Sequence, residues 1–437
     1  MIIQLIIVIA AIILGARLGG VGLGVTGGLG LAILVFVFGL EPTSPPIDVM
    51  LMIVSVIAAA AAMQAAGGLD YLVLLAERLL RKHPQYVTIL SPIIAYLFTF
   101  VAGTGHVAYS ILPVISEVAR ETKIRPERPL GISVIASQQA ITASPISAAT
   151  VALLGMLSGF DLSLFDILKV SIPATLTGVI VAALFSMRQG KNLDDDPEYN
   201  KRLEAGLIKD EKLEMKSIKN IVYARLSVAI FILSTILIVI LGSFSSLRPE
   251  FVIDGKTTVL NMPYIIEILM LSTAALILLF TKTNGIEAAT GSVFIAGMQA
   301  VIAIFGIAWM GDTFLKGNLV EITQNIEGIV TEMPWLFGVA LFVMSILLYS
   351  QAATVRAIVP LGIALGISPY LLIALFPAVN GYFFIPNYPT VVAAINFDRT
   401  GTTRIGKYVL NHSFMQPGMI ATVVGLLTGY LLVNLYW

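Results

Sequence analysis

The sequence predicts an all-α integral membrane protein with roughly 10–12 transmembrane or re-entrant segments in two inverted-topology repeats. Of its 437 residues, 57% are hydrophobic and only 12% are charged, whereas soluble domains carry about 25% charged residues. Uncharged runs at 21–40, 49–66, 129–157, 226–243 and 334–355 each approach or exceed the roughly 20 residues that span a bilayer. A single segment rich in Lys and Arg separates these runs into two groups.

Composition also argues against several other classes of function. The chain has no cysteine, which excludes disulfides and thiolate metal sites, and its formal net charge of zero argues against nucleic acid as a partner. Neither a P-loop nor an HExxH zinc motif occurs. We therefore expect no cofactor, no metal and no enzyme activity. The alternative, a membrane-embedded enzyme, would need a catalytic dyad or metal cluster, which three scattered histidines do not suggest.

The segment that separates the two groups holds a third of the positive charge. Residues 188–225 contain nine of the 26 Lys and Arg residues, and loops rich in Lys and Arg stay cytoplasmic. We therefore interpret 188–221 as a cytoplasmic linker between a first repeat, 1–187, and a second repeat, 222–437.

The elements of the first repeat follow from apolar runs and from Gly and Pro interruptions. Pro92, Gly103, Gly105 and Pro113 break the run at 86–120, which predicts a re-entrant hairpin rather than one span. The expected elements in chain order are spans at 2–16, 21–40 and 48–66, an amphipathic surface helix at 69–82, the hairpin at 86–120, and spans at 129–157 and 166–187.

The second repeat has the same order of elements. Its expected elements are spans at 222–243, 263–281 and 285–310, a re-entrant hairpin at 334–366, and spans at 369–396 and 413–436. Each hairpin is followed by a span broken by proline, SQQAITASPISA in the first repeat and FFIPNYPTVVAA in the second. Because the repeats enter the membrane from opposite sides, the pattern is typical of a secondary transporter.

The positions of the positive charges test this assignment of loops to the two sides of the membrane, which we call the charge map. It puts 21 of the 26 Lys and Arg residues on the cytoplasmic side, with Arg248, Lys256 and Lys316 outside. Lys169 and Arg356 fall within apolar segments, and snorkelling to the outer surface accounts for Lys169. The map also predicts that both termini are periplasmic.

Four segments are irregular and polar together, one hairpin tip and one broken span in each repeat. Irregular backbone at membrane depth is tolerated where it lines a cavity, and half-helix N-termini favour an anionic carboxylate. The expected binding residues are Gly103, Thr104, Gly105, His106, Thr142, Ser144, Pro145, Ser350, Gln351, Thr354, Arg356, Asn387 and Thr390. For each of these small polar residues, close helix packing is the alternative interpretation.

Charged residues near the hairpins carry two interpretations each. Arg356 could clamp a carboxylate or snorkel to the outer surface, and His106 could join proton coupling or be a neutral hydrogen-bonded residue. Glu77, Arg81 and Arg125 could attract dianions to the inner mouth. They could equally reflect only the excess of positive charge on the cytoplasmic side.

Several motifs of the chain resemble one family nearly end to end. These motifs include GARLGG at 15–20, GTGHVAYSILPVI at 103–115, IRPERP at 124–129, ITASPISAA at 141–149, SQAATVRA at 350–357, GYFFIPNYPT at 381–390 and TGTTRIGKYVLNHSF at 400–414. The sequence resembles the anaerobic C4-dicarboxylate transporter (Dcu) family of bacteria, and GTGH, IRPERP and FFIPNYP look closer to its DcuB branch than to its DcuA branch.

The resemblance implies exchange of fumarate, malate or aspartate outside for succinate inside, across the bacterial inner membrane. It also implies an ion-transporter-type fold that works by an elevator motion, a homodimer, and, in some members, association with a membrane sensor kinase. The small-molecule dicarboxylates and the lipid bilayer are thus the expected partners. A transporter of another organic anion on the same fold is the alternative function.

Overall fold

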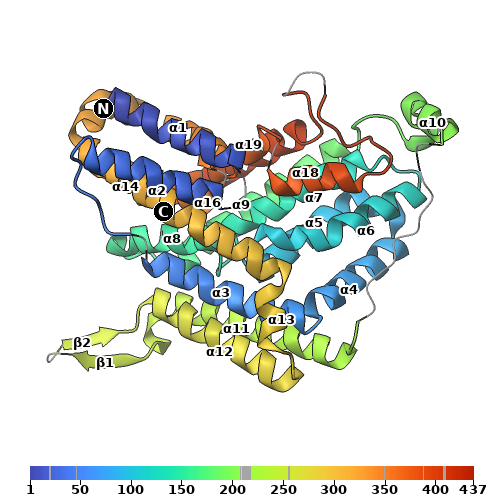
Figure 1. Cartoon of the computed structure of the whole chain (residues 1–437), viewed down its shortest axis with the longest axis horizontal. Helices are drawn as coiled ribbons and strands as arrows, with labels where there is room; N and C mark the ends of the chain where they lie inside the picture. Colours follow the sequence, from blue (N-terminus) through green and yellow to red (C-terminus); the bar gives the residue numbers. More distant parts are fainter. Residues whose placement is uncertain are drawn as a thin grey trace.

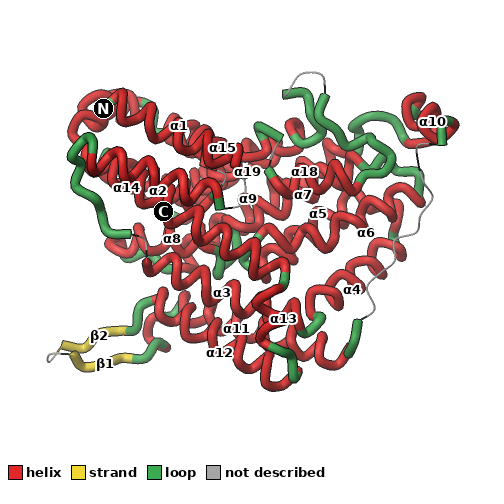
Figure 2. The backbone as a smooth tube through the Cα atoms, viewed as in Figure 1, coloured by secondary structure: helices red, strands yellow, loops and turns green. Residues whose placement is uncertain are grey.

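Helices make up almost the whole chain, apart from one β-hairpin and the connecting loops (Figure 2). The computed structural model describes residues 1–437 except 19–20, 46, 207, 209–217, 254–255, 349, 387 and 407–409. Side chains of a further set are not described, among them His106 and residues 322–331.

The helices follow one another along the chain with short connections. Before the linker they are α1 Ile2–Leu18, α2 Gly22–Phe36, α3 Ile47–Ala65, α4 Gly68–Lys82, η1 Pro84–Tyr86, α5 Val87–Ala102, η2 Gly105–Val107, α6 Ala108–Glu121, α7 Glu127–Gln139, η3 Ala140–Thr142, α8 Ala148–Leu157, η4 Ser158–Phe160 and α9 Leu164–Ser186. The linker holds η5 Leu193–Asp195 and α10 Pro197–Glu204.

The part of the chain after the linker begins at α11. Its elements are α11 Ile221–Ser243, η6 Ser245–Leu247, β1 Glu250–Ile253, β2 Lys256–Val259, α12 Met262–Thr281, α13 Gly285–Thr290, α14 Ser292–Glu332, α15 Leu336–Leu348, α16 Gln351–Ala364, α17 Pro369–Leu375, η7 Phe376–Phe383, α18 Pro389–Phe397 and α19 Met415–Tyr436. The strands pair antiparallel, with Glu250 opposite Val259.

Six helices of the described chain are long and apolar enough to cross a membrane, namely 84–102, α9, α11, α12, the 292–318 part of α14, and α19. A seventh span is possible if α3 and α4, which meet at a bend of 68°, are counted as one. Shorter apolar helices, among them the two of the hairpin at 334–366, complete the set. This is the all-helical membrane class that the sequence predicts.

The helices form two groups around the hairpins. In one group α14 packs along α2, α2 along α1, and α3 along α12 and α14 (Figure 1). In the other, α9 packs along α19, and α7 lies against both α5 and α9. The β-hairpin and the N-terminus lie at one end of the molecule and α10 at the other (Figure 1).

Glycines allow the closest helix contact of the first group. A methyl group added to Gly306 of α14 would lie 1.8 Å from the Gly24 carbonyl oxygen of α2, and one added to Gly27 would lie 2.5 Å from the Gly306 carbonyl carbon. Backbones approach this closely in membranes only where side chains are absent. The glycine-rich run at 15–30 therefore serves packing, through Gly24 and Gly27.

The helix breaks coincide with the irregular segments of the sequence. The hairpin at 86–120 consists of α5 and α6 joined through η2, and the hairpin at 334–366 consists of α15 and α16. The run at 129–157 breaks between α7 and α8, and the run at 369–396 breaks between η7 and α18.

Two details differ from the expected elements. The span expected at 285–310 is the short helix α13 followed by the 41-residue helix α14, which at 1.5 Å per residue is about 60 Å long. The loop before α12 folds as the hairpin β1–β2 because it combines β-branched residues such as Val252, Thr257 and Thr258.

Candidate functional site

Residues of all four irregular segments line one cavity of about 150 Å³. We define tip 1 as residues 103–105, tip 2 as residues 350–352, break 1 as residues 140–147 and break 2 as residues 384–388. Ile141 and Ile146 of break 1 and Tyr388 of break 2 join the two tips in the wall. A cavity of about this volume admits a molecule of benzene's size, so it is on the scale of a small metabolite.

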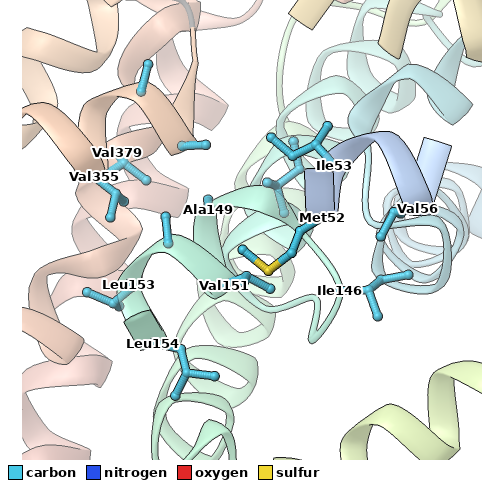
Figure 3. Packing of buried hydrophobic residues seen from close by; sticks show 14 of the residues in the cluster. Met52, Ile53, Val56, Ile146, Ala149, Val151, Leu153, Leu154, Val355 and Val379 are labelled. Atoms are coloured by element: carbon cyan, nitrogen blue, oxygen red, sulfur yellow. The ribbon is translucent and has the colours of Figure 1, made fainter. Parts of the chain in front are cut away.

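Helices α3 and α14 complete the wall with apolar side chains. Ile53, Val56 and Ile57 of α3 and Gly297 of α14 line the cavity. Figure 3 shows Ile53 and Val56 beside Ile146 of break 1, within the apolar core that surrounds the cavity. The cavity therefore lies where the helices of the first group meet the two hairpins.

Tip 1 depends on two glycines for different reasons. Gly103 ends α5 with φ +69°, a left-handed conformation that disfavours other residues. Gly105 has a partner side chain directly against its backbone, since an added methyl group would lie 2.7 Å from Nε2 and 2.8 Å from Oε1 of Gln138. Thr104 between them lines the cavity.

Tip 2 is the N-terminus of α16. Ser350 is its N-cap, with its Oγ accepting a hydrogen bond from the Ala353 N–H at 3.2 Å. Ser350 and Gln351 line the cavity, so free N–H groups and the positive end of the helix dipole lie at its wall, an arrangement that favours an anion. Thr354 donates to the Ser350 carbonyl oxygen at 2.8 Å and stabilises this turn.

In break 1, the hydroxyl groups bond to nearby backbone instead of the cavity. Ser144 donates to the Phe100 carbonyl oxygen at 2.7 Å, and Thr142 donates to the Gln139 carbonyl oxygen at 2.8 Å. Both residues and Pro145 are buried. These bonds fasten break 1 to the end of α5, next to tip 1.

A buried amide network, not recognised in the sequence, connects α7 and break 1 with tip 2 and η7. The Gln351 Nε2 group donates to Gln138 Oε1 at 3.4 Å and to Asn380 Oδ1 at 3.2 Å. Asn380 in turn donates to Gln139 Oε1 at 3.1 Å and to Thr142 Oγ1 at 3.3 Å. Uncharged amides at membrane depth were the available signal, since Gln138 and Gln139 stand within an otherwise apolar run.

The network continues to α18, which follows break 2, and to α19. Gln138 Nε2 donates to Thr390 Oγ1 at 3.2 Å, and Gln139 Nε2 donates to Thr422 Oγ1 of α19 at 3.2 Å. The aromatic rings of Tyr382 and Tyr388 contact each other with centroids 4.4 Å apart and planes tilted by 38°. The arrangement can present amide, hydroxyl and backbone donors to a small polar ligand in a largely apolar enclosure.

Comparison with known proteins decides the family. Residues 1–437 match the family described as anaerobic C4-dicarboxylate membrane transporter, DcuA_DcuB. The chain belongs to this Dcu family. It is 45% identical over 436 residues to the C4-dicarboxylate transporter DcuA of Escherichia coli K12, covering 99% of each chain. It is 42% identical over 450 residues to the anaerobic C4-dicarboxylate transporter DcuB of Escherichia coli O6:H1, covering 99% of this chain and 98% of that one.

These identities refine the expectation from the motifs. The family is confirmed, and the chain is a multi-pass membrane protein of a transporter family and not an enzyme. The similar identities to DcuA and DcuB do not favour the DcuB branch.

A solved structure shares the fold. The crystal structure of the Alcanivorax borkumensis YdaH transporter matches with a TM-score of 0.54 at 14% identity, covering 93% of this chain and 87% of that chain. At this identity the likeness concerns the fold alone. It agrees with the all-helical transporter architecture of this Dcu family member.

The predicted site residues differ in where the structure puts them. Gly103, Thr104, Gly105, Ser350 and Gln351 line the cavity. Thr142, Ser144, Pro145, Thr354 and Thr390 are buried in the segments around it. His106 lies in η2 with its side chain outside the described residues, and Asn387 lies wholly outside them. Their substrate roles stay predictions.

Arg356 lies on α16, four residues after Ala352 and therefore on the same face. It is not among the described residues that line the cavity. Its charge interacts with the carboxylate of Asp312 on α14, and the two helices touch there, because an added methyl group at Gly311 would lie 3.8 Å from Ala357 Cβ. Arg356 is thus one turn from tip 2 and beside an acidic neighbour.

The other candidate charges connect helices far from the cavity wall. Arg81 donates from Nε to Glu77 Oε1 at 2.8 Å and also bonds Glu121 at the end of α6. Arg125 bonds Glu127 at 2.5 Å and Asp196 of the linker. Burial works against the charge of Arg125, but these two carboxylates raise its pKa above the usual value. Arg125 therefore fastens the linker to the start of α7.

Proposed function

We propose that this chain is a secondary transporter that exchanges C4-dicarboxylates across the bacterial inner membrane, with fumarate, malate or aspartate entering and succinate leaving. The observation that carries the proposal is the cavity lined by both hairpin tips, in a chain that belongs to a C4-dicarboxylate transporter family. Both relatives are named as C4-dicarboxylate transporters.

The geometry suits a small dianion. The N-terminus of α16 directs a helix dipole and backbone N–H groups to the cavity, and Thr104 and Ser350 offer hydroxyl groups as side-chain donors. The apolar remainder of the wall favours the carbon chain and excludes water, which strengthens each polar contact. One carboxylate held near each tip is the simplest pose for a two-ended substrate.

Alternating access is the mechanism expected of two inverted repeats, 1–187 and 222–437, and the family resemblance implies that it proceeds by an elevator motion. Sequence spacing supports the repeats, since Gly103 and Ser350 each stand ten residues before a helix proline, Pro113 or Pro360. The matched amides Gln139 and Asn380, each six residues before a proline, hydrogen-bond one another. This hydrogen bond joins two residues that the proposed repeats would relate to each other.

The membrane orientation has both termini in the periplasm and the linker in the cytoplasm. Ion pairs support it, because they join residues that the charge map assigns to one side. Lys123 pairs with Asp194 at 3.4 Å inside, and Lys316 pairs with Glu41 at 3.2 Å outside. At the outer end Lys169 lies over the Trp437 ring at 3.8 Å and pairs with Asp166, in line with an interfacial position.

Two partners follow from the family resemblance, a second copy of this chain in a homodimer and a membrane sensor kinase in some members. Cross-linking in native membranes, followed by size analysis, tests the homodimer. Co-purification of a sensor kinase from the native membrane tests the second partner.

Exchange in purified proteoliposomes tests the function. Labelled fumarate should enter liposomes that are loaded with succinate, in the absence of ATP, and not enter liposomes that are loaded with buffer. Citrate and a sulfonated metabolite serve as competitors that represent another organic anion. If citrate exchanged and fumarate did not, the substrate class would be wrong. Strict dependence on ATP would contradict secondary transport.

A further inference from the structure

The side chain of Gln138 contacts both hairpin tips. It lies in the last turn of α7 and is only 1% exposed. Its amide packs against Gly105 of tip 1, and its Oε1 atom accepts a hydrogen bond from Gln351 of tip 2 at 3.4 Å. Its Nε2 atom donates to Thr390, the first turn of the helix after break 2, at 3.2 Å.

Gln138 supports the cavity wall from behind. Gly105 and Gln351 line the cavity, whereas Gln138 is not among the described residues of its wall. Interiors are close-packed, so wall residues cannot move outward unless the side chains behind them yield. The length of the Gln138 side chain therefore limits how far Gly105 and Gln351 can separate.

We propose that Gln138 is a positioning residue that sets the chain length of the substrate, by fixing the separation of the two hairpin tips. The inference rests on the proposed function, in which each tip holds one carboxylate. In that pose the number of carbons between the carboxylates must match the distance between the tips. Pockets discriminate one methylene group by about 10- to 200-fold, which is enough to separate succinate from glutarate, the next longer dicarboxylate.

Shortening this support by one methylene group tests the proposal. Gln138→Asn withdraws the amide from Gly105 and Gln351 and lets the wall yield, so glutarate should gain about tenfold in affinity relative to succinate. The matched control is Gln139→Asn, because Gln139 is equally buried and its described amide bonds go to Thr422 and Asn380. Gln139→Asn should leave the ratio of glutarate affinity to succinate affinity unchanged, whatever its effect on the transport rate.

The readouts are inhibition of labelled fumarate exchange and ligand-induced shifts of the melting temperature, each with succinate and glutarate. A third variant, Gln138→Met, keeps the length of the side chain and removes the acceptor for Gln351. Gln138→Met should weaken succinate binding several-fold and leave the ratio of glutarate affinity to succinate affinity nearly unchanged. It also provides the test if Gln138→Asn does not fold.

The possible outcomes separate the proposal from a purely structural role. The proposal is overturned if folded Gln138→Asn has the wild-type ratio of glutarate affinity to succinate affinity. It is also overturned if Gln139→Asn changes this ratio as much as Gln138→Asn does. If Gln138→Met changed the affinity for glutarate relative to succinate as much as Gln138→Asn does, hydrogen bonding and not side-chain length would control selectivity. An unchanged succinate affinity in Gln138→Met would also contradict the positioning role. If the wild-type protein neither binds nor exchanges succinate, the proposed function itself has failed, whatever the variants do.

Discussion

The amide group of Gln138 packs directly against the backbone of Gly105, and a methyl group added to Gly105 would lie 2.7 Å from Gln138 Nε2. Gly105→Ala therefore forces the buried amide to move, and inserting a methyl group into a packed site typically costs about 1–3 kcal/mol. We expect a lower melting temperature and a large loss of fumarate exchange.

The double variant shows whether this contact is the cause. Gly105→Ala combined with Gln138→Ala removes the clash, so the two changes should be non-additive by roughly 0.5–3 kcal/mol. Gly28→Ala is the control, because nothing lies within 4 Å of a methyl group at Gly28. Strict additivity of Gly105→Ala and Gln138→Ala in the unfolding free energy would contradict the contact.

Ser350 offers a second prediction, in which stability and binding separate. Its Oγ caps α16 at the cavity, and loss of an N-cap costs about 1 kcal/mol. Ser350→Ala should therefore lower the unfolding free energy by about that amount and weaken succinate binding moderately. Ser350→Asp retains a good cap but adds a negative charge at the cavity, so it should fold normally and bind no dianion. Normal succinate binding by Ser350→Asp would place the substrate elsewhere.

Arg125 is predicted to matter for stability. Its guanidinium is buried with the carboxylates of Glu127 and Asp196. Removing one partner of a buried ion pair costs about 3–5 kcal/mol, so Arg125→Ala should destabilise the cytoplasmic end strongly. Lys123→Ala is the control, because the Lys123–Asp194 pair is exposed and such pairs contribute about 0–1 kcal/mol. Thermal unfolding of both variants in detergent makes the comparison, and equal melting temperatures would contradict the role of Arg125.

The fold could largely be predicted because its irregular points carry recognisable residues. Gly103 occupies a left-handed conformation at the end of α5, and prolines mark both breaks. Since glycine and proline act locally on the backbone, the helix breaks that they cause can be predicted from sequence alone. The separation into two groups of helices could not be predicted in this way, because it depends on contacts such as Gly24 with Gly306.

The candidate site could be predicted only in part. The tips were identified, but hydroxyl groups such as those of Thr142 and Ser144 bond to nearby carbonyl oxygens, as short polar side chains often do. The longer amides of Gln138, Gln139 and Asn380 instead reach across the repeats. Which distant residues they meet is a property of tertiary packing, so their spacing in the sequence gave no indication.

Reporter fusions test the orientation of the chain. A reporter that is active only in the periplasm should be inactive within 190–220, and active after Trp437 or within 252–258, the β-hairpin region. The expectation follows from the nine Lys and Arg residues at 188–225 and from the opposite positions of α10 and the β-hairpin in Figure 1. A strong signal from the linker would contradict the whole map.

The last prediction concerns Arg356, which has two possible partners, a substrate carboxylate and Asp312. It lies one turn after Ala352 of the cavity wall, and its side chain leans toward the N-terminus of α16, as helical side chains do. It also interacts with the charge of Asp312. If Arg356 contacts a substrate carboxylate, Arg356→Ala should abolish exchange and weaken succinate binding by about 3–5 kcal/mol. Arg356→Lys should retain some function, since it keeps the charge and loses only the bidentate geometry.

The double variant with Asp312 distinguishes the two partners of Arg356. Arg356→Gln leaves the Asp312 carboxylate without this neighbouring cation, so it should lower stability, and Arg356→Gln combined with Asp312→Asn should restore it. Succinate protection against thermal unfolding is then measured in the restored protein. If succinate gives no protection, Arg356 holds the dianion. If protection is full, the dipole of α16 and the donors of the cavity wall hold the dianion without this residue, and Arg356 serves the contact between α14 and α16.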